Sequence, residues 1–236
     1  MKISLCVPMY NESTIIADTA KELYEYMNKH FEDYEIIFSD DGSRDGSAEI
    51  VKNLNLPNTK VVGYEKNQGK GCAVRHGVLA SCGDIVIFTD ADLAYGVEVI
   101  KEAIEILKKG EHSMVVASRA KHKDGYEGYT PIRKLASKTY IKVINVFGGI
   151  KISDSQCGFK AFDGQKGRKI FSYCQTNNFA FDLEVILIAQ RMKLKIYELP
   201  AKIINHRESK VNVIKDAFRM MKEISVIKKN IAKIEF

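Results

Sequence analysis

Two aspartates follow an apolar run of strand length. Asp90 and Asp92 stand one residue apart, just after the run Ile85–Phe88. Two carboxylates this close repel each other unless a cation lies between them, and carboxylate oxygens are the ligands that Mg²⁺ and Mn²⁺ prefer. The pair therefore predicts a divalent metal site, which would neutralise phosphate groups during phosphoryl or glycosyl transfer. The alternative is a strand-end turn in which Asp92 caps the next helix.

Two other loops carry groups suited to a nucleotide. In the segment DDGS, Asp40 or Asp41 can accept hydrogen bonds from a nucleobase N–H or from ribose hydroxyls. The alternative is an Asx turn, which we expect for Asp45 with Ser47 capping the following helix. The segment NQGKG places backbone amides at a predicted helix start beside Lys70, an arrangement that binds anions. It matches neither a Walker A loop nor a dinucleotide fingerprint, and a plain helix-capping turn is the alternative.

The elements that must position these loops alternate between strand and helix types. Apolar strand-like runs are followed by helix-like segments in the order 3–7, 13–29, 35–38, 47–54, 60–64, 70–80, 85–88, 97–109 and 113–117. This rhythm predicts an α/β fold with one mostly parallel twisted sheet and helices on both faces. Since ligands bind beyond the carboxyl ends of such strands, the polar clusters that follow five strands predict a single site.

Length, charge and cysteine usage limit the class of protein. The chain has 236 residues and a formal net charge of +6, which fits one large α/β domain and is too diffuse for nucleic acid. Five cysteines without a CxxC pair favour reduced thiols in the cytoplasm over disulfides or a zinc site. We expect no signal peptide and no spanning helix, so any membrane association is expected to be peripheral, on the cytoplasmic face.

In combination, the motifs identify a family. The chain resembles the family 2 glycosyltransferases of the GT-A fold, which share the order and spacing of PMYNE at 8–12, DDGS at 40–43, NQGKG at 67–71 and DAD at 90–92. Later segments, DSQCGFK at 154–160, FDLE at 181–184 and ELP at 198–200, are similar to those of dolichyl-phosphate glucose synthases and their polyprenyl-phosphate relatives. The resemblance covers roughly residues 2–212, so we expect a GT-A domain at 1–210 and a C-terminal amphipathic helical extension at 211–236.

The resemblance implies roles for individual residues. Asp90 and Asp92 would hold the divalent metal, Mn²⁺ or Mg²⁺, against the donor diphosphate. Arg119 and Arg133 would face donor or acceptor phosphates. The residues expected to hold the nucleoside are Pro8, Tyr10, Glu12 and Asp41.

Two departures narrow the assignment within the family. Mannose synthases often carry a metal-binding glutamine two residues after the second aspartate, where this chain has Ala94. The QxxRW signature of processive polymerases is missing as well. The first departure weakens the mannose assignment, and the second argues against polymer synthesis. The resemblance to the glucose synthases implies UDP-glucose rather than GDP-mannose as the donor.

The acceptor decides which further groups are needed. A phosphate acceptor is already an anion and needs cations rather than a base, and the residues that fit this demand are Arg119, Arg133, Lys134, Lys138, Arg207 and Lys210. A hydroxyl acceptor would need a general base, for which Asp182 or Glu184 is the candidate unless Asp182 caps the helix 183–192. We also expect Asp154 and Gln156 to contact the sugar.

Two basic stretches with interleaved apolar residues predict contact with a lipid surface. Residues 130–153 contain five Lys or Arg and no acidic residue, and the stretch from Lys210 repeats the pattern. The alternative is that ordinary helices cover the sheet with solvated lysines.

The first hypothesis is thus a metal-dependent inverting hexosyltransferase acting on polyprenyl phosphate. The alternatives are transfer to a saccharide hydroxyl in capsule or cell-wall assembly, and a catalytically silent nucleotide-sugar-binding module.

Overall fold

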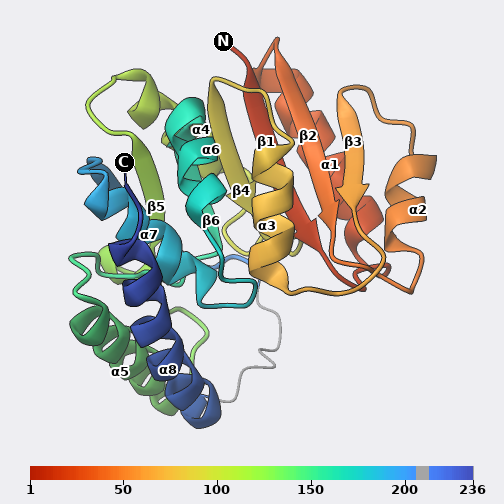
Figure 1. Cartoon of the computed structure of the whole chain (residues 1–236). Coiled ribbons are helices and arrows are strands. Elements are labelled where there is room, and N and C mark those ends of the chain that lie inside the picture. Colours follow the sequence, from red (N-terminus) through yellow and green to blue (C-terminus); the bar gives the residue numbers. More distant parts are fainter. Residues whose placement is uncertain (206–212, 236) are drawn as a thin grey trace.

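The chain folds into one sheet with helices on both faces (Figure 1). The computed structural model describes residues 1–205 and 213–235, with side chains described except at residues 132, 133, 136, 140, 144 and 213–222. The strands of the sheet are β1 (Ile3–Met9), β2 (Tyr34–Asp40), β3 (Thr59–Gly63), β4 (Ile85–Thr89), β5 (Met114–Ser118), β6 (Phe159–Asp163) and β7 (Ile196–Pro200). The helices are α1 (Ile16–His30), α2 (Ser47–Asn53), α3 (Lys70–Leu79), α4 (Glu98–Lys108), the 3₁₀ helix η1 (Arg119–Lys121), α5 (Pro131–Gly148), α6 (Gly164–Tyr173), α7 (Phe181–Arg191) and α8 (Val213–Ala232).

The strand order explains where a site can form. The seven strands lie in the order β3-β2-β1-β4-β6-β5-β7, and all neighbours are parallel except β6, which runs antiparallel to β4 and β5. This confirms the predicted α/β fold with a mostly parallel sheet. The chain builds outward from β1 through β2 and β3 and then returns to place β4 on the other side of β1. The carboxyl ends of β1 and β4 therefore flank the crevice in which such sheets bind ligands.

The core has one layer on each face of the sheet, because successive strand residues point to opposite faces. In β1, Leu5 and Val7 pack with the first layer and Cys6 with the second. Helix α1 buries an apolar stripe at helical spacing against the first layer, as an amphipathic surface helix does. Helices α3, α6 and α7 contribute to the second layer.

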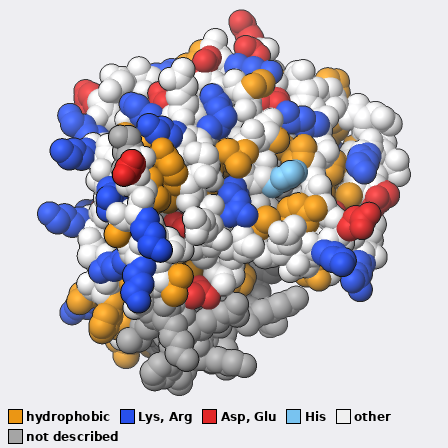
Figure 2. All heavy atoms as spheres, viewed as in Figure 1, with side chains coloured by type: hydrophobic (Ala, Val, Ile, Leu, Met, Phe, Trp, Pro, Cys, Tyr) orange, Lys and Arg blue, Asp and Glu red, His pale blue; other side chains and the backbone are white. Residues whose placement is uncertain are grey.

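Helices α5 and α8 lie side by side at the lower left of Figure 1. The C-terminal part of α8 packs into the second core layer through Ile224, Ile227 and Ile231, which are all buried. The domain boundary at residue 210 stays a prediction. Among the described residues, no helix combines the length and the apolar character needed to cross a bilayer. Figure 2 shows Lys and Arg side chains dispersed over one face of the molecule rather than gathered in a single stripe.

Candidate active site

The paired acids lie in the crevice beside the end of β1. Cys6 of β1 pairs with Phe88 of β4, so Asp90 follows at the level where β1 ends. The loop then turns through Leu93, which has a left-handed φ of 46°. Asp92 Oδ1 accepts a hydrogen bond from the Ala94 amide at 3.1 Å. Helix α4 begins six residues later, at Glu98, so Asp92 does not cap it, and the helix-capping alternative is wrong.

A glycine leaves room for the first aspartate. Antiparallel pairing of Thr89 with Phe159 brings Gly158 against Asp90. A Cβ atom at Gly158 would lie 2.1 Å from Asp90 Oδ2, closer than real atoms approach. The side chain of Asp90 is 27% exposed and therefore reachable from solvent. Two hard oxygen donors in a partly open cradle fit a divalent cation. No group of three or more His, Cys, Asp or Glu in the described part of the chain is arranged to hold a metal.

A lysine already neutralises Asp90. Lys70 Nζ lies 2.6 Å from Asp90 Oδ1, and about a quarter of each side chain is exposed. Burial acts to lower the pKa of Lys70, but the carboxylates of Asp90, Asp182 and Asp92 outweigh it and raise that pKa. Lys70 therefore carries its charge throughout the neutral range. In the protein alone, this ammonium group supplies the positive charge beside Asp90, and the charge of Asp92 acts on it less strongly.

Asp182 forms a buried ion pair with Lys160. The Lys160 side chain is fully buried, donates to Asp182 Oδ1 and to the Cys157 carbonyl, and stacks over the Phe88 ring. Burial raises the pKa of the Asp182 carboxyl, and the nearby charges of Lys160 and Lys70 only partly oppose it. Asp182 is the second residue of α7 rather than its cap, so the capping alternative is wrong here too.

Asp41 holds the NQGKG loop. The residue is 3% exposed, and its carboxylate accepts hydrogen bonds from the Tyr64 hydroxyl, the Asn67 amide and the backbone amides of Gln68 and Gly69, at 2.7–3.1 Å. The anion that those amides bind is therefore Asp41 itself. The sequence left this loop open to binding a ligand anion or to a plain helix-capping turn, and predicted that Asp41 binds the nucleoside. In the structure both fix the backbone on either side of Lys70, and the contact of Asp41 with a nucleoside stays a prediction.

Neighbouring carboxylates build the turn that follows β2. Both oxygens of Asp40 accept from the Ser43 amide at 3.2–3.3 Å. Asp45 accepts from the Ser47 amide, the Ser47 hydroxyl and the Ser13 amide. These hydrogen bonds outweigh desolvation and lower the pKa of Asp45 to about 2. The expected Asx turn at Asp45 is present, although Gly46 rather than Ser47 occupies the N-cap of α2.

The PMYNE loop lies against that turn. Asn11, with a left-handed φ of 53°, donates its amide to Ser43 Oγ and accepts from the Arg44 amide, each at 2.9 Å. The Glu12 amide donates to Ser47 Oγ. Tyr10 is 45% exposed at the mouth of the crevice, whereas Pro8 is buried within β1. The loops after β1 and β2 thus form one connected rim, with the Tyr10 ring free to stack on a planar ligand.

Arg119 and Asp154 neutralise each other. Asp154 is fully buried and accepts from Arg119 Nε at 2.7 Å and Nη2 at 2.9 Å. Arg119 opposes the effect of burial and lowers the pKa of Asp154. The remaining guanidinium nitrogen, Nη1, lies 3.4 Å from the Tyr129 hydroxyl. The sequence predicted that Arg119 contacts a phosphate and that Asp154 contacts the sugar. In the structure the two side chains form an ion pair with each other, and both are buried.

Of the other residues predicted to contact a ligand, the structure describes the side chain of Gln156 but not those of three basic residues. Gln156 has a buried amide nitrogen with no hydrogen-bond partner in the described part of the chain, as expected of a group that awaits a ligand oxygen. The side chain of Arg133 and all of Arg207 and Lys210 lie outside the described residues.

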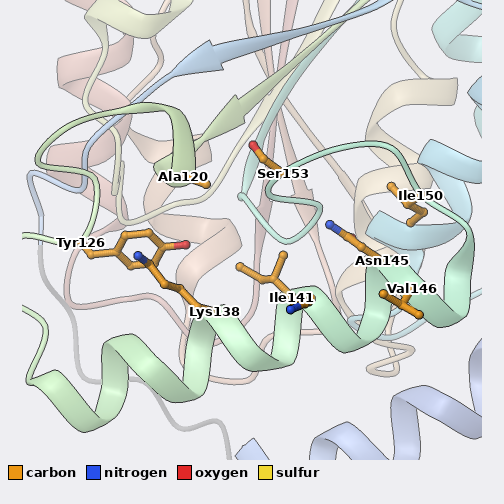
Figure 3. A pocket seen from close by; sticks show the side chains of 9 residues that line it. Ala120, Tyr126, Lys138, Ile141, Asn145, Val146, Ile150 and Ser153 are labelled. Carbon is orange, nitrogen blue, oxygen red and sulfur yellow. The ribbon is translucent and has the colours of Figure 1, made fainter.

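A cavity opens at the same edge of the sheet, beside α5 (Figure 3). Its volume is about 370 Å³. Ala120 lines it from η1, directly after β5, and Ser153 from the segment that leads to β6. The other lining residues are mostly apolar, with two lysines: Tyr126, Lys138, Ile141, Lys142, Asn145, Val146 and Ile150. Lys138 lies over the Tyr126 ring, with its nitrogen 5.3 Å from the ring centre.

Sequence reasoning missed three participants. Lys160 is the partner of Asp182, and a charged residue inside the apolar strand FKAF was the available signal. The Tyr64 hydroxyl donates a hydrogen bond to Asp41, and the Tyr126 ring packs against the cationic groups of Arg119 and Lys138. For the tyrosines no pattern in the sequence indicates the partner.

Known proteins resemble this chain in sequence and in fold. The model of glycosyl transferase family 2 matches residues 4–171. A dolichyl-phosphate beta-glucosyltransferase of Trichomonas vaginalis is 33% identical over 220 residues, covering 88% of this chain and 65% of that protein. The dolichyl-phosphate beta-glucosyltransferase of Saccharomyces cerevisiae is 30% identical, covering 96% and 74%. The chain thus spans about two thirds of the length of these relatives.

Solved structures agree on the fold. Glucosyl-3-phosphoglycerate synthase from Mycobacterium tuberculosis, crystallised with Mn²⁺, UDP-glucose and phosphoglyceric acid, aligns with a TM-score of 0.70 at 18% identity, covering 99% of this chain and 81% of that one. A mannosyl-3-phosphoglycerate synthase from Rubrobacter xylanophilus aligns with a TM-score of 0.64. With the family model covering most of the chain and the paired acids at the predicted crevice, this protein belongs to glycosyltransferase family 2.

Proposed function

We propose that this protein is a metal-dependent, inverting hexosyltransferase that moves glucose from UDP-glucose to a polyprenyl phosphate. The relatives at 30–33% identity are named as dolichyl-phosphate beta-glucosyltransferases. A β-linked product formed from an α-linked nucleotide-sugar requires inversion, which a single displacement accomplishes without a covalent intermediate.

The donor end of the site is the crevice between β1 and β4. Asp90 and Asp92 would hold Mn²⁺ or Mg²⁺, which supplies positive charge to the leaving diphosphate. Lys70, on the rigid loop held by Asp41, adds a second positive charge beside it. Tyr10 and the rim formed by the loops after β1 and β2 receive the nucleoside, and the unpaired amide of Gln156 donates to the sugar or to a phosphate oxygen.

The cavity beside α5 is the observation that carries the acceptor assignment. It combines apolar walls with the ammonium groups of Lys138 and Lys142 at the carboxyl edge of the sheet. That chemistry matches an isoprenoid chain with a phosphate at its end, and a saccharide would instead call for polar walls. We also expect Arg133, Arg207 and Lys210 to face the acceptor phosphate.

The candidate general base is engaged elsewhere. A hydroxyl acceptor would need Asp182 or Glu184 to take its proton. Asp182 Oδ1 already accepts from the buried Lys160, and Glu184, which is buried, accepts from the backbone amides of Gln175 and Thr176. A phosphate acceptor is anionic near neutral pH and needs no base. The ion pair therefore favours the phosphate over the hydroxyl.

Helix α5 would bring the cavity to a membrane surface. Leu135, Val146 and Phe147 are 54–70% exposed on this helix, which contains basic but no acidic residues. An apolar and basic surface of this kind binds the interface of an anionic bilayer. We propose a peripheral position on the cytoplasmic face.

A transfer assay tests the proposal. The protein is mixed with Mn²⁺, a panel of UDP- and GDP-sugars, and either a short polyprenyl phosphate or oligosaccharides. We expect sugar in the organic phase, with UDP-glucose the best donor. Sugar found only in the aqueous phase would support a hydroxyl acceptor, and donor binding without any product would support the silent binding module.

Two pairs of lysine substitutions test the acceptor cavity. Lys138→Met with Lys142→Met should raise the KM for the lipid about tenfold, since each lost phosphate contact weakens binding. The matched pair Lys101→Met with Lys109→Met on and after α4 removes the same charge far from the cavity and should leave that KM unchanged. Equal effects of the two pairs would contradict the assignment.

A further inference from the structure

The positive charge of Lys70 lies beside Asp90, where a bound metal ion would also lie. Its ammonium group lies 2.6 Å from Asp90 Oδ1, one of the two carboxylates assigned to the metal. A metal ion that binds Asp90 Oδ1 meets the positive charge of Lys70, whose ammonium group already lies against that oxygen. Metal binding therefore has to displace the Lys70 side chain or accept repulsion from it.

The backbone around Lys70 is fixed, so the side chain alone can move. A Cβ at Gly69 would lie 2.5 Å from the Asn177 carbonyl oxygen, and one at Gly71 would lie 2.6 Å from Phe181 Cβ. These two glycines let the loop pack directly against the segment that leads into α7. Asp41 holds the same loop from the other side. A four-carbon side chain that is about a quarter exposed can swing from such a fixed base.

The charges in the crevice show what metal binding would do. Three carboxylates, Asp90, Asp92 and Asp182, face two ammonium groups, Lys70 and Lys160, which leaves one net negative charge. A divalent cation alone would turn this into a net positive charge. The diphosphate of a nucleotide-sugar would bring it back below zero and offer Lys70 a new partner.

We propose that Lys70 is an internal counter-ion that disfavours metal binding without nucleotide and couples metal binding to donor binding. In this scheme the ammonium group leaves Asp90 when metal and nucleotide arrive together, and pairs with the diphosphate. The inference rests on the proposed donor site but does not depend on the acceptor. By linkage, nucleotide then tightens metal binding and metal tightens nucleotide binding by the same factor.

Metal titrations test the proposal without any transfer reaction. Free Mn²⁺ is counted by electron paramagnetic resonance, with and without UDP, for the wild type and for Lys70→Met. The wild type should bind Mn²⁺ weakly alone and at least about tenfold more tightly with UDP. Lys70→Met should bind Mn²⁺ alone about tenfold more tightly than the wild type, and UDP should add much less.

Two further variants make the outcome decisive. Lys66→Met removes the same charge from an exposed position in the same loop and should behave as the wild type. Lys70→Gln keeps a polar group at Asp90 without the charge, serves if Lys70→Met does not fold, and should show the same gain. Unchanged or weaker Mn²⁺ binding in both Lys70 variants, or an unchanged effect of UDP, would overturn the proposal, and so would absence of Mn²⁺ binding in every variant. Because no sugar is transferred, failure here is distinct from failure of the proposed activity.

Discussion

Asp41→Asn should destabilise the protein strongly, because this side chain holds a loop from inside. The buried carboxylate accepts from four donors, two of them backbone amides. An asparagine keeps one acceptor oxygen and turns an amide toward the donors on the other side. The Asn67 amide can turn over to match it. The Gly69 backbone N–H lies 3.1 Å from one oxygen and 3.0 Å from the other, so it keeps the first contact, loses the second and faces the new amide.

The magnitude follows from these contacts. Hydrogen bonds to a charged group contribute about 1.5–3 kcal/mol each, and a buried donor left unpaired costs about 1–3 kcal/mol. Losing one such bond and weakening the others gives a loss on the order of 3 kcal/mol in the free energy of unfolding. For a chain of this size the loss lowers the melting temperature by about 6–12 °C.

Urea denaturation of Asp41→Asn beside Asp40→Asn measures the effect. Asp40 is the adjacent carboxylate, is partly exposed and accepts from the Ser43 amide at 3.2–3.3 Å. We expect its substitution to cost less than about 1 kcal/mol, as for most surface changes. Equal stabilities of the two variants would refute the role given to Asp41. A variant that stays as stable as the wild type and loses only nucleotide affinity would restore the direct contact with the nucleoside.

Three other predictions follow from buried contacts. Gly158→Ala should abolish Mn²⁺–UDP binding, because its Cβ would lie 2.1 Å from Asp90 Oδ2, and should cost only about 1–3 kcal/mol in stability. Calorimetry compares this variant with Gly77→Ala, whose Cβ would meet atoms no closer than 3.3 Å. Undiminished binding in Gly158→Ala would refute the prediction. Arg119→Met should destabilise the protein by about 3–5 kcal/mol, because it leaves Asp154 charged and buried without its partner; urea denaturation measures the loss, and a loss below about 1 kcal/mol would show that the pair is dispensable. Glu35 is desolvated, yet hydrogen bonds from Ser4, Lys60 and Cys82 outweigh this and lower its pKa from 4.5 to about 2. Since the folded pKa lies below the unfolded one, Glu35 stabilises the fold fully above about pH 4.5 and loses this contribution as the pH falls toward 2; Glu35→Gln should therefore lose less stability than the wild type across that window, and parallel acid-unfolding curves would contradict the pKa.

The architecture and the position of the site were predictable because they depend on local pattern. Buried parallel strands such as β1 read as continuous apolar runs, and the residues that follow them meet at one edge. Asp90 and Asp92 could therefore be placed together before any coordinates.

Pairings between distant residues were not predictable. The partner of Asp154 is Arg119, 35 positions earlier, and that of Asp182 is Lys160, 22 positions earlier. No local spacing specifies either pair, since each forms only when β6 inserts antiparallel between β4 and β5. The same limit applies to Asp41. Its sequence context predicts a contact with a ligand, but in the fold its buried carboxylate accepts hydrogen bonds from the backbone of the NQGKG loop.

A crystal structure with Mn²⁺ and UDP tests the central claim most directly. We expect an anomalous manganese peak between the carboxylates of Asp90 and Asp92 and the diphosphate. The uracil should lie near Tyr10, and the Lys70 ammonium group should have turned from Asp90 toward a phosphate. A peak at another place, or UDP bound away from the crevice between β1 and β4, would contradict it.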